Sequence, residues 1–348
     1  MAEKSFFHEI HQELDAKLVP DGKYQLPLFY PGGAVAEHRH TLAGASLFDR
    51  SGTGCFQIAG KDAGKKLDKL FFRSSSALKV GSSMSNFMLT AQKTFAAVFT
   101  LNRMQEDDFM LLLDREVPDK NRNFLLDSIE KSGLTVRDLS GMMAVLHLSG
   151  AKAGEVLLEA GAASFLENAC WQMAEVADED GDKFRCIVTR HDRFGVPGFD
   201  LCVNADNALE FYGALYRING ISPAGSAAWE SLRLESSLPA FPGELHDGVT
   251  PAECGFPVEN PAQLPSRLAI AETARHAALP GTVVKLSGGI TAGVVTSGAY
   301  CPKIGKARIF CRLDGSVDLE SPAEVTLLIN GTEESAILSV FSIADSGL

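Results

Sequence analysis

The segment from 231 to 256 constrains the fold most, because it places charged residues inside an apolar frame. It reads SLRLESSLPAFPGE and then, from 250, TPAECGF, with Arg233 and Glu235 on either side of a leucine and Glu253 before a cysteine. An unpaired charge in a protein interior costs several kcal/mol, so a buried frame of this kind requires partners for its charges. The residues alone fit a structural ion pair and the scaffold of a ligand site equally well.

The composition favours a soluble protein of more than one domain. At 348 residues the chain is long enough for two or three domains, and its 45% apolar and 22% charged residues are ordinary for a globular protein. It has no run of about 18 apolar residues, so we expect no membrane span and no membrane partner. The first residues, MAEKSFFHEIHQEL, are too polar for a signal peptide, and we expect a cytoplasmic protein.

The charge and the cysteines exclude further classes. A net charge of −12 argues against nucleic acid as a partner, because phosphate neutralisation requires clustered Lys and Arg, although a local basic pocket can still receive an anion. The cysteine number is odd and no CxxC is present, so we expect neither a metal site nor a disulfide framework. Most cysteines should be small buried hydrophobes. The cysteines are Cys55, Cys170, Cys186, Cys202, Cys254, Cys301 and Cys311.

Periodicity predicts alternating helices and strands in the first two thirds of the chain. Apolar residues at steps of four predict an amphipathic helix over 6–19, ended by a turn at 20–22. Further helices are predicted over 35–43, 61–72, 117–133, 151–161 and 207–220. Strands are predicted within 46–60, over 87–101, 109–114 and 142–150, and on both sides of a Gly/Pro turn in 182–204.

The last third of the chain has a different pattern. The segment 259–264, ENPAQL, is a candidate linker. After it come short runs that are rich in β-branched residues and punctuated by glycine, which suggest a small all-β barrel. These runs cover 281–302, 306–314, 323–331 and 335–341.

Five pieces of the chain resemble, in order, the glycine cleavage T-protein (aminomethyltransferase) family. They include AEHRHTLAGASLFDRSG (36–52), LTVRDLSGMMAVLHLSGAKAGEVL (134–157) and VVTSGAYCPKIGKARI (294–309), and the similarity runs from about Phe6 to Arg312. The resemblance implies an α+β fold, a three-domain ring with mixed α/β N-terminal domains and a C-terminal all-β barrel.

The resemblance also implies the domain boundaries. A folate-binding region would cover 1–264, and the barrel 265–348. Within the first region, two α+β subdomains would interleave, one formed by roughly 1–50 with 225–264 and the other by 51–224.

The resemblance further implies tetrahydrofolate as the cofactor, held by a carboxylate that accepts two parallel hydrogen bonds from the pterin ring. In DRFGVPGFD (192–200), Asp200 takes the place of the family's glutamate, with Phe199 beside it and Arg193 in the turn. A solvated aspartate at a strand end is the alternative. Trp229 replaces a folate-contacting arginine and could stack on a flat ring or fill the space. Asp114 and Tyr24 complete the predicted cofactor-binding set.

The largest departure from the family lies in LTAQKTFAAVFTL (89–101). Ala96 and Ala97 occupy the position of the family's catalytic aspartate, and no Asp or Glu lies between Thr90 and Leu101. A positioned base typically contributes about 10²–10⁴-fold to a rate. The sequence therefore predicts no catalytic residue here, which argues against the glycine-cleavage reaction itself.

Other reactive residue types carry weaker signals. His8 and His11, and His38 and His40, lack a partner in a metal-ligand spacing, so we interpret them as surface histidines rather than ligands. Cys254 could be a nucleophile, but no activating base is evident. Lys303 and Lys306 could meet the glutamate tail of folate or belong to a solvated loop.

Two functions follow from the resemblance. The first is a tetrahydrofolate-dependent one-carbon transferase, which moves an aminomethyl or methyl group from an unknown donor to tetrahydrofolate. Its partners would be folate and either a small one-carbon donor or a lipoyl carrier protein. The alternative is a non-catalytic folate-binding protein, a sensor or assembly factor on the same fold, which would bind tetrahydrofolate without releasing a product.

Overall fold

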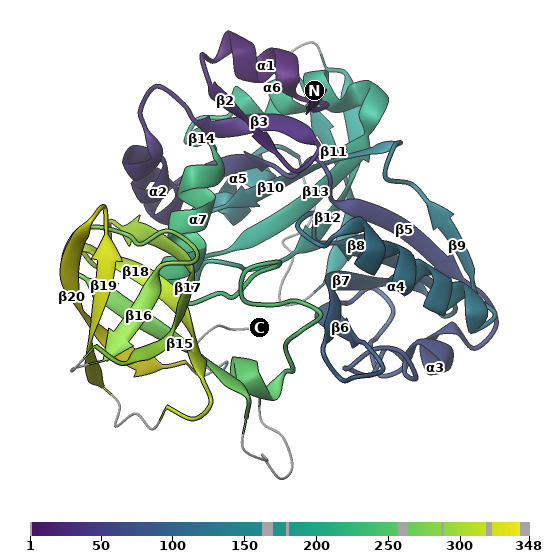
Figure 1. Cartoon of the computed structure of the whole chain (residues 1–348). Helices are drawn as coiled ribbons and strands as arrows, with labels where there is room; N and C mark the ends of the chain where they lie inside the picture. The colour runs from purple at the N-terminus through teal and green to yellow at the C-terminus, as the bar shows by residue number, and fades with distance from the viewer. Residues whose placement is uncertain are drawn as a thin grey trace. The chain divides into compact units, whose positions relative to one another are not determined.

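The computed structural model describes residues 2–161, 170–178, 181–256, 264–286, 289–317 and 322–341. Contacts between residues divide the chain into two compact units, each of which is described by itself (Figure 1). The first unit contains Met1–Leu89 and Ala96–Trp229, and the second contains Thr90–Phe95 and Glu230–Leu348.

A six-stranded sheet, with strand order β11-β12-β13-β10-β4-β14, carries the candidate site of the first unit. Its strands β10 and β13 are antiparallel and directly opposed from Met143↔Asn204 to Ser149↔Gly198. The strands are β4 (Ala45–Asp49), β10 (Met143–Ser149), β11 (Trp171–Ala177), β12 (Lys183–Arg190), β13 (Gly198–Asn204) and β14 (Ile221–Ala224).

Helices cover one face of this sheet and make that face apolar. Leu146 on β10 and Leu201 on β13 share a hydrophobic core with Val156 and Phe211 of the helices. Because side chains alternate along a strand, the residues next to these leucines, His147 on β10 and Asp200 on β13, face the other side of the sheet. The helices are α1 (His8–Glu13), α5 (Ala153–Glu159) and α6 (Ala208–Tyr216).

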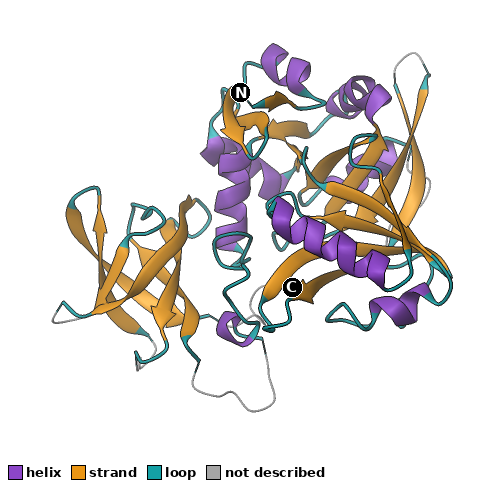
Figure 2. Ribbon diagram, turned by 45° about the vertical axis from the view of Figure 1, so that its right-hand side comes forward, coloured by secondary structure: helices purple, strands orange, loops and turns teal. Residues whose placement is uncertain are grey.

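A second sheet of the first unit has the strand order β6-β7-β8-β5-β9. Figure 2 distinguishes the strands and helices of the chain by colour. A buried hydrogen bond of 3.0 Å from Asn102 Nδ2 to Thr189 Oγ1 joins it to the six-stranded sheet. Its helix α4 (Asp119–Lys131) follows Pro118 and buries Leu125 and Ile129. The strands are β5 (Gly54–Ala59), β6 (Ser83–Leu89), β7 (Phe95–Gln105), β8 (Asp108–Leu113) and β9 (Thr135–Asp138), and α3 covers Ala63–Leu67.

Smaller elements complete the first unit. β1 (Glu3–Lys4), β3 (Tyr24–Phe29) and β2 (Lys17–Asp21) form a three-stranded sheet in that order, followed by α2 (Ala34–Ala43). The helix predicted over 6–19 is wrong beyond Glu13, because Asp15 takes a left-handed conformation (φ 53°) and the following residues pair with β3. The helix predicted over 61–72 is likewise reduced to α3.

The second unit contains a closed barrel with strand order β15-β18-β17-β16-β19-β20, as the sequence predicts. Val284, Ile309, Leu327 and Leu338 belong to its apolar interior. The strands are β15 (Ser266–Thr273), β16 (Val283–Leu286), β17 (Thr291–Cys301), β18 (Lys306–Asp314), β19 (Ala323–Ile329) and β20 (Thr332–Val340). Helix α7 (Ser226–Glu235) contains the boundary between the units. Of the linker predicted over 259–264, residues 259–263 lie outside the described residues.

Three charged residues of the 231–256 segment, Arg233, Glu244 and Glu253, are buried and have hydrogen-bond partners, as the sequence requires. Arg233 Nη1 donates to Glu244 Oε2 at 3.1 Å, and Arg233 Nη2 lies 2.5 Å from Glu230 Oε1. Glu244 is fully buried and also accepts hydrogen bonds from the hydroxyls of Thr296 (2.6 Å) and Ser297 (2.7 Å). The structural ion pair is confirmed, and Glu244 is the fully buried partner of Arg233.

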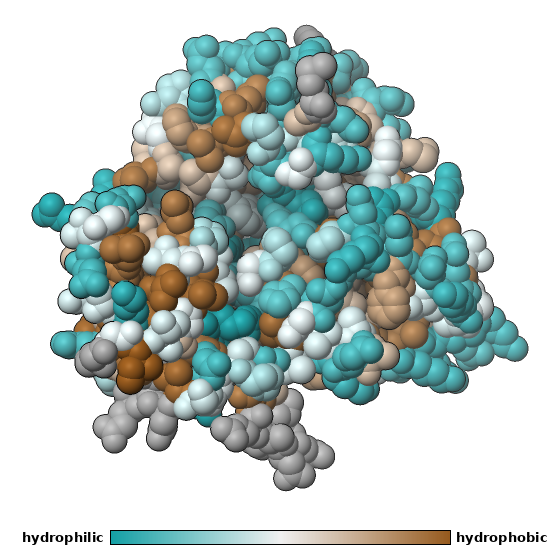
Figure 3. Space-filling view, in the orientation of Figure 1, coloured by the Kyte–Doolittle hydropathy of each residue, from teal (hydrophilic) through white to brown (hydrophobic). Residues whose placement is uncertain are grey.

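The surface carries apolar residues on the barrel. Hydrophobic residues gather over the barrel strands on the face shown in Figure 3, and Leu328 and Ile337 are 53% and 46% exposed. Among the described residues, no helix has the length and apolar character needed to cross a membrane.

Candidate active site

A buried aspartate held by two histidines lies in the six-stranded sheet of the first unit. Asp200 on β13 is directly opposite His147 on β10, on the face turned away from the helices. Asp200 Oδ1 lies 2.8 Å from His147 Nδ1, and Asp200 Oδ2 lies 2.7 Å from His191 Nδ1. Gly198 permits this arrangement, because a Cβ there would lie 2.5 Å from the His191 carbonyl oxygen and 3.1 Å from the His147 ring.

The protonation states follow from burial and from these contacts. Burial lowers the pKa of His147 to about 4, although the nearby Asp200 opposes the shift. His147 is therefore neutral at pH 7 and donates Nδ1–H to the carboxylate. Burial alone would raise the pKa of Asp200, but His191 and the two histidine hydrogen bonds outweigh it and hold that pKa well below its usual range. Asp200 thus stays ionised.

An aromatic cluster surrounds Trp229 beside this group. The Trp229 ring makes edge-to-face contacts with Phe48, His147 and Phe194, at centroid distances of 5.3, 5.3 and 4.9 Å. The Arg50 guanidinium lies over the Trp229 ring at 4.0 Å. Trp229 therefore packs against His147 and fixes its position.

A charge network extends from this cluster. Arg50 Nη2 donates to both oxygens of Glu116, at 3.0 and 3.1 Å, and Arg115 Nε donates to Glu116 at 3.1 Å. Burial would raise the pKa of Glu116, but the two guanidiniums lower it to about 2. Arg193 donates to Asp114 at 3.0 Å and lies 5.5 Å from the Trp229 ring centre. The aromatic cluster is thus held between ion pairs.

A cavity of about 270 Å³ lies against His191. His191 Nδ1 lies 3.1 Å from Thr100 Oγ1 as well as close to Asp200, whereas its Nε2 forms no hydrogen bond with the described residues. Ser83 also lines the cavity, and its Oγ is buried without a hydrogen-bond partner in the described structure. The cavity is lined by Ser83, Met84, Ser85, Thr100, Arg190, His191 and Asp192.

The structure brings together four of the six predicted cofactor-binding residues. Asp200, Trp229, Arg193 and Asp114 belong to the cluster just described. The ring of Phe199 instead belongs to the apolar core on the other face of the sheet. Tyr24 lines a separate cavity that it shares with Arg50.

The sequence interpretation missed the two histidines and the Arg50–Glu116 pair. A signal for His147 was present, since it stands alone among apolar residues in AVLHLS, a strand that is buried throughout. A polar side chain in such a strand needs a partner, and Asp200 is the residue opposite. His191 and Arg50 lie at strand ends, where the sequence gives no comparable signal.

Ala96 and Ala97 are both fully buried, and Asn121 Nδ2 donates to the Ala96 carbonyl oxygen at 2.7 Å. The position that the resemblance gives to the family's catalytic carboxylate is therefore part of the packed interior of β7. Cys254 is buried too, and burial raises the pKa of its thiol to about 11, which argues against a nucleophile.

The interpretation of the histidine pairs as surface residues is wrong for His8, His11 and His38, which are buried. His11 Nε2 lies 2.9 Å from Asp49 Oδ2, so a carboxylate satisfies its ring inside the protein. Within the described ranges, no group of three or more His, Cys, Asp or Glu side chains is arranged to hold a metal ion. Of the two lysines considered for folate, Lys306 pairs with Glu272 at 3.0 Å.

Comparison with known proteins identifies the family. The GCVT N-terminal domain model matches residues 7–258 of this chain. The chain belongs to the glycine cleavage T-protein family. An aminomethyltransferase of Corynebacterium aurimucosum is 27% identical over an alignment of 349 positions, which covers 93% of each chain. One from Clostridium botulinum (strain Kyoto / Type A2) is 27% identical over 250 residues, which cover 71% of this chain and 67% of the relative.

A solved structure supports the same fold. The crystal structure of glycine cleavage system aminomethyltransferase T from Bartonella henselae matches with a TM-score of 0.82, covering 99% of this chain and 98% of that chain. The identity is 23%, so this likeness concerns the fold. The predicted α+β fold with a C-terminal barrel is confirmed, while the predicted boundaries at 50, 225 and 264 stay predictions.

Proposed function

We propose that this protein binds tetrahydrofolate and transfers a one-carbon group, aminomethyl or methyl, from a donor to it. The observation that carries the proposal is Asp200. By the resemblance it takes the place of the family's pterin-binding carboxylate. It stays ionised, and His147 and His191 orient it. Family membership and the aminomethyltransferase relatives support the same reaction class.

The donor set of the site fits a reduced pterin. A carboxylate offers about four lone-pair directions, and each Asp200 oxygen accepts one histidine hydrogen bond. Each oxygen keeps an acceptor direction for a ring N–H and the adjacent amino group of the pterin. Arg50 covers one face of Trp229, so we assign Trp229 to positioning His147 rather than to stacking on that face.

The chemistry must work without a carboxylate on β7. Tetrahydrofolate would supply the nitrogen that accepts the one-carbon unit. Asp200 would orient the pterin, and neutral His147 would keep Asp200 in place. His191 lines the cavity with Nε2 available, so it can accept or donate a hydrogen bond there. Positioning and fixed charges would then supply most of the rate acceleration.

The second candidate function is folate binding without turnover. It is favoured by one observation, the fully buried Ala96 and Ala97 at the family's catalytic position. For the transferase, the identity of the one-carbon donor decides the reaction. A lipoyl carrier protein as donor would indicate glycine cleavage, and a small methylated amine would indicate a different pathway. The cytoplasmic location expected from the sequence stays a prediction.

A turnover assay tests the proposal. The purified protein is incubated anaerobically with tetrahydrofolate and either an aminomethyl-loaded lipoyl carrier or a small methylated amine, and the folate products are separated by mass. We expect methylene- or methyl-tetrahydrofolate with one donor class and none with Asp200→Asn. Tetrahydrofolate binding with no product from either donor class would support the non-catalytic alternative.

A further inference from the structure

Two histidines share the Asp200 carboxylate, and the same placement of the proton follows for both. Asp200 Oδ1 lies 2.8 Å from His147 Nδ1, and Asp200 Oδ2 lies 2.7 Å from His191 Nδ1. An ionised carboxylate accepts hydrogen bonds but has no proton to donate, so each Nδ1 carries the hydrogen. A neutral imidazole has a single N–H, which leaves a lone pair on Nε2. In their neutral forms, both histidines therefore present Nε2 as a proton acceptor.

The surroundings of the two Nε2 atoms differ. His147 is fully buried, and its Nε2 is enclosed without a hydrogen-bond partner among the described residues. The rings of Trp229 and Phe194 pack against the His147 ring at centroid distances of 5.3 and 6.1 Å. His191 lines the cavity of about 270 Å³, and its Nε2, also without a partner in the described structure, is not enclosed. Of the two nitrogens, His191 Nε2 is therefore the one that a substrate can reach.

The His191 ring is held through its other nitrogen. Thr100 Oγ1 on β7 lies 3.1 Å from His191 Nδ1, in addition to the Asp200 carboxylate on β13. The backbone is fixed as well, because the His191 N–H donates to the Gly198 carbonyl oxygen at 2.8 Å. An imidazole that a carboxylate orients through Nδ1, and whose Nε2 is free, has the arrangement of a general base.

The other described residues that line this cavity are poorly suited to take up a proton. Asp192 is the lining carboxylate, and its oxygens accept hydrogen bonds from Arg190 Nε at 3.1 Å, Arg190 Nη2 at 3.0 Å and the Gly198 N–H at 2.9 Å. Such contacts stabilise the ionised form and make the carboxylate a weaker base. The remaining lining side chains are those of two serines, a threonine, a methionine and an arginine, none of which is a base near neutral pH.

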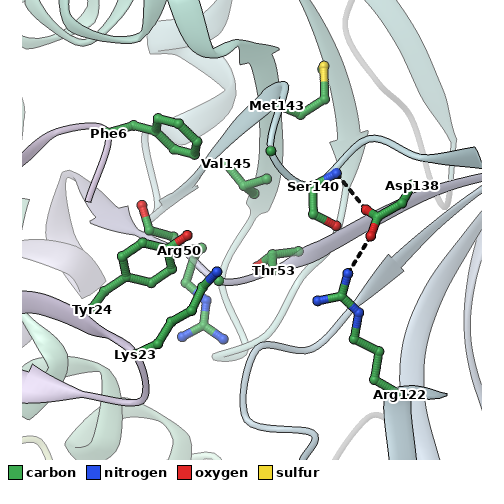
Figure 4. Close-up of a pocket in the computed structure, with 13 residues that line it drawn as sticks. Phe6, Lys23, Tyr24, Arg50, Thr53, Arg122, Asp138, Ser140, Met143 and Val145 are labelled. Atoms are coloured by element: carbon green, nitrogen blue, oxygen red, sulfur yellow. Dashed lines mark hydrogen bonds and ion pairs between the residues drawn. The ribbon is translucent and has the colours of Figure 1, made fainter. Parts of the chain in front are cut away.

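A second cavity of the first unit, of about 240 Å³, offers no comparable group (Figure 4). No histidine is among its described lining residues. Its carboxylate, Asp138, pairs with Arg122 at 2.6 Å and accepts the Ser140 backbone N–H at 2.9 Å, as Figure 4 shows. Of these two cavities, the one beside Asp200 therefore contains the oriented proton acceptor.

We propose that His191 Nε2 is the general base of the one-carbon transfer, in place of the carboxylate that Ala96 and Ala97 replace. This role rests on the proposed function. His191 Nε2 takes up the proton of the accepting N–H as the lone pair of that nitrogen forms the bond to the one-carbon group. The electron pair of the broken carbon–donor bond leaves with the donor. The imidazolium so formed keeps its Nδ1–H on Asp200, whose negative charge stabilises it.

The first test needs no turnover. In the full chain labelled with ¹⁵N-histidine, the imidazole NMR signals of His191 are assigned by their loss in His191→Asn. Above neutral pH we expect a protonated Nδ1 and an unprotonated Nε2. Diethyl pyrocarbonate acylates accessible, unprotonated imidazole nitrogens, so peptide mass mapping should find His191 modified in the native protein and His147 only after unfolding. A proton on Nε2 of neutral His191, or a His191 as unreactive as His147, would overturn the proposal.

The second test separates chemistry from binding. His191→Asn keeps a side-chain N–H for Asp200 but has no basic nitrogen at the cavity, so kcat should fall about 10²–10⁴-fold. The affinity for tetrahydrofolate should stay within about threefold of the wild-type value. The decrease of kcat toward acidic pH should disappear in this variant. In His191→Ala, added imidazoles should restore turnover, and the more basic ones should restore more of it. The control His276→Asn changes a 59% exposed histidine and should behave like the wild type.

The outcomes separate this role from the proposed function. Equal kcat in the wild type and His191→Asn, or rescue that does not depend on the basicity of the imidazole, would overturn the role of His191 and leave the transferase in place. A wild type that binds tetrahydrofolate but forms no product with either donor class would overturn the transferase, and the general base with it. The two failures are distinguishable, because product from the wild type is absent only in the second.

Discussion

Acidification should destabilise this protein through His147 before most carboxylates titrate. The pKa of His147 is about 4 in the folded protein, against 6.5 for a free histidine. Between these values the unfolded chain binds a proton that the folded chain excludes, so the free energy of unfolding falls as the pH falls. Each pH unit is worth about 1.4 kcal/mol, which gives about 3 kcal/mol over the window from 6.5 to 4. Above pH 6.5 this group contributes no pH dependence.

Urea unfolding at pH 6.5 and 4.5, followed by tryptophan fluorescence, measures this effect. The variant His147→Asn keeps a side-chain N–H for Asp200 but cannot titrate. Its free energy of unfolding should therefore fall by about 2–3 kcal/mol less than that of the wild type over this interval. The control His276→Asn changes a 59% exposed histidine that pairs with Glu334. Glu116, with a pKa of about 2, does not contribute above pH 4.5. An equal decrease in the free energy of unfolding of the wild type and of His147→Asn would refute the assignment of a buried neutral His147.

Three further predictions concern the neighbouring groups. Glu116→Gln leaves the buried Arg50 and Arg115 without their shared carboxylate. In urea titrations it should lower the free energy of unfolding by about 3–5 kcal/mol, and a decrease below about 1 kcal/mol would contradict the charge network. Ala96→Asp should not restore the family's base, because position 96 is fully buried and an unpaired carboxylate there costs several kcal/mol. The melting temperature of the variant should fall. A variant as stable as the wild type with increased turnover would contradict the prediction. Cys254, whose thiol pKa is about 11, should resist thiol-modifying reagents in the native protein and react only after unfolding, as peptide mass mapping would show.

The sequence predicts the regular elements of the chain better than its buried polar groups. Helix α4, framed by Pro118 and Gly133, and the barrel strands have local signals that their packing reinforces. The helix over 6–19 failed because apolar residues at steps of four continue past Asp15, whose left-handed backbone ends α1 and lets the chain turn into β2.

The candidate site depends on pairings between distant segments, which a single sequence does not display. The resemblance located Asp200, but its partner His147 lies 53 residues earlier and becomes visible only with the register of β10 and β13. Trp229 gave two alternatives from the sequence, and the Arg50 guanidinium over its ring favours a packing role. The charges of the 231–256 segment were predicted to need partners, yet only the structure identifies Glu244 as the partner of Arg233.

Isothermal titration with tetrahydrofolate under anaerobic conditions tests the central claim most directly. The account predicts micromolar binding to the wild type and about 10- to 100-fold weaker binding to Asp200→Asn, which removes the charge that accepts two pterin hydrogen bonds. Asp206→Asn, a change at an exposed aspartate of the same unit, should bind like the wild type. No heat of binding with the wild type, or equal affinity in Asp200→Asn, would contradict the assignment of Asp200 as the pterin-binding carboxylate.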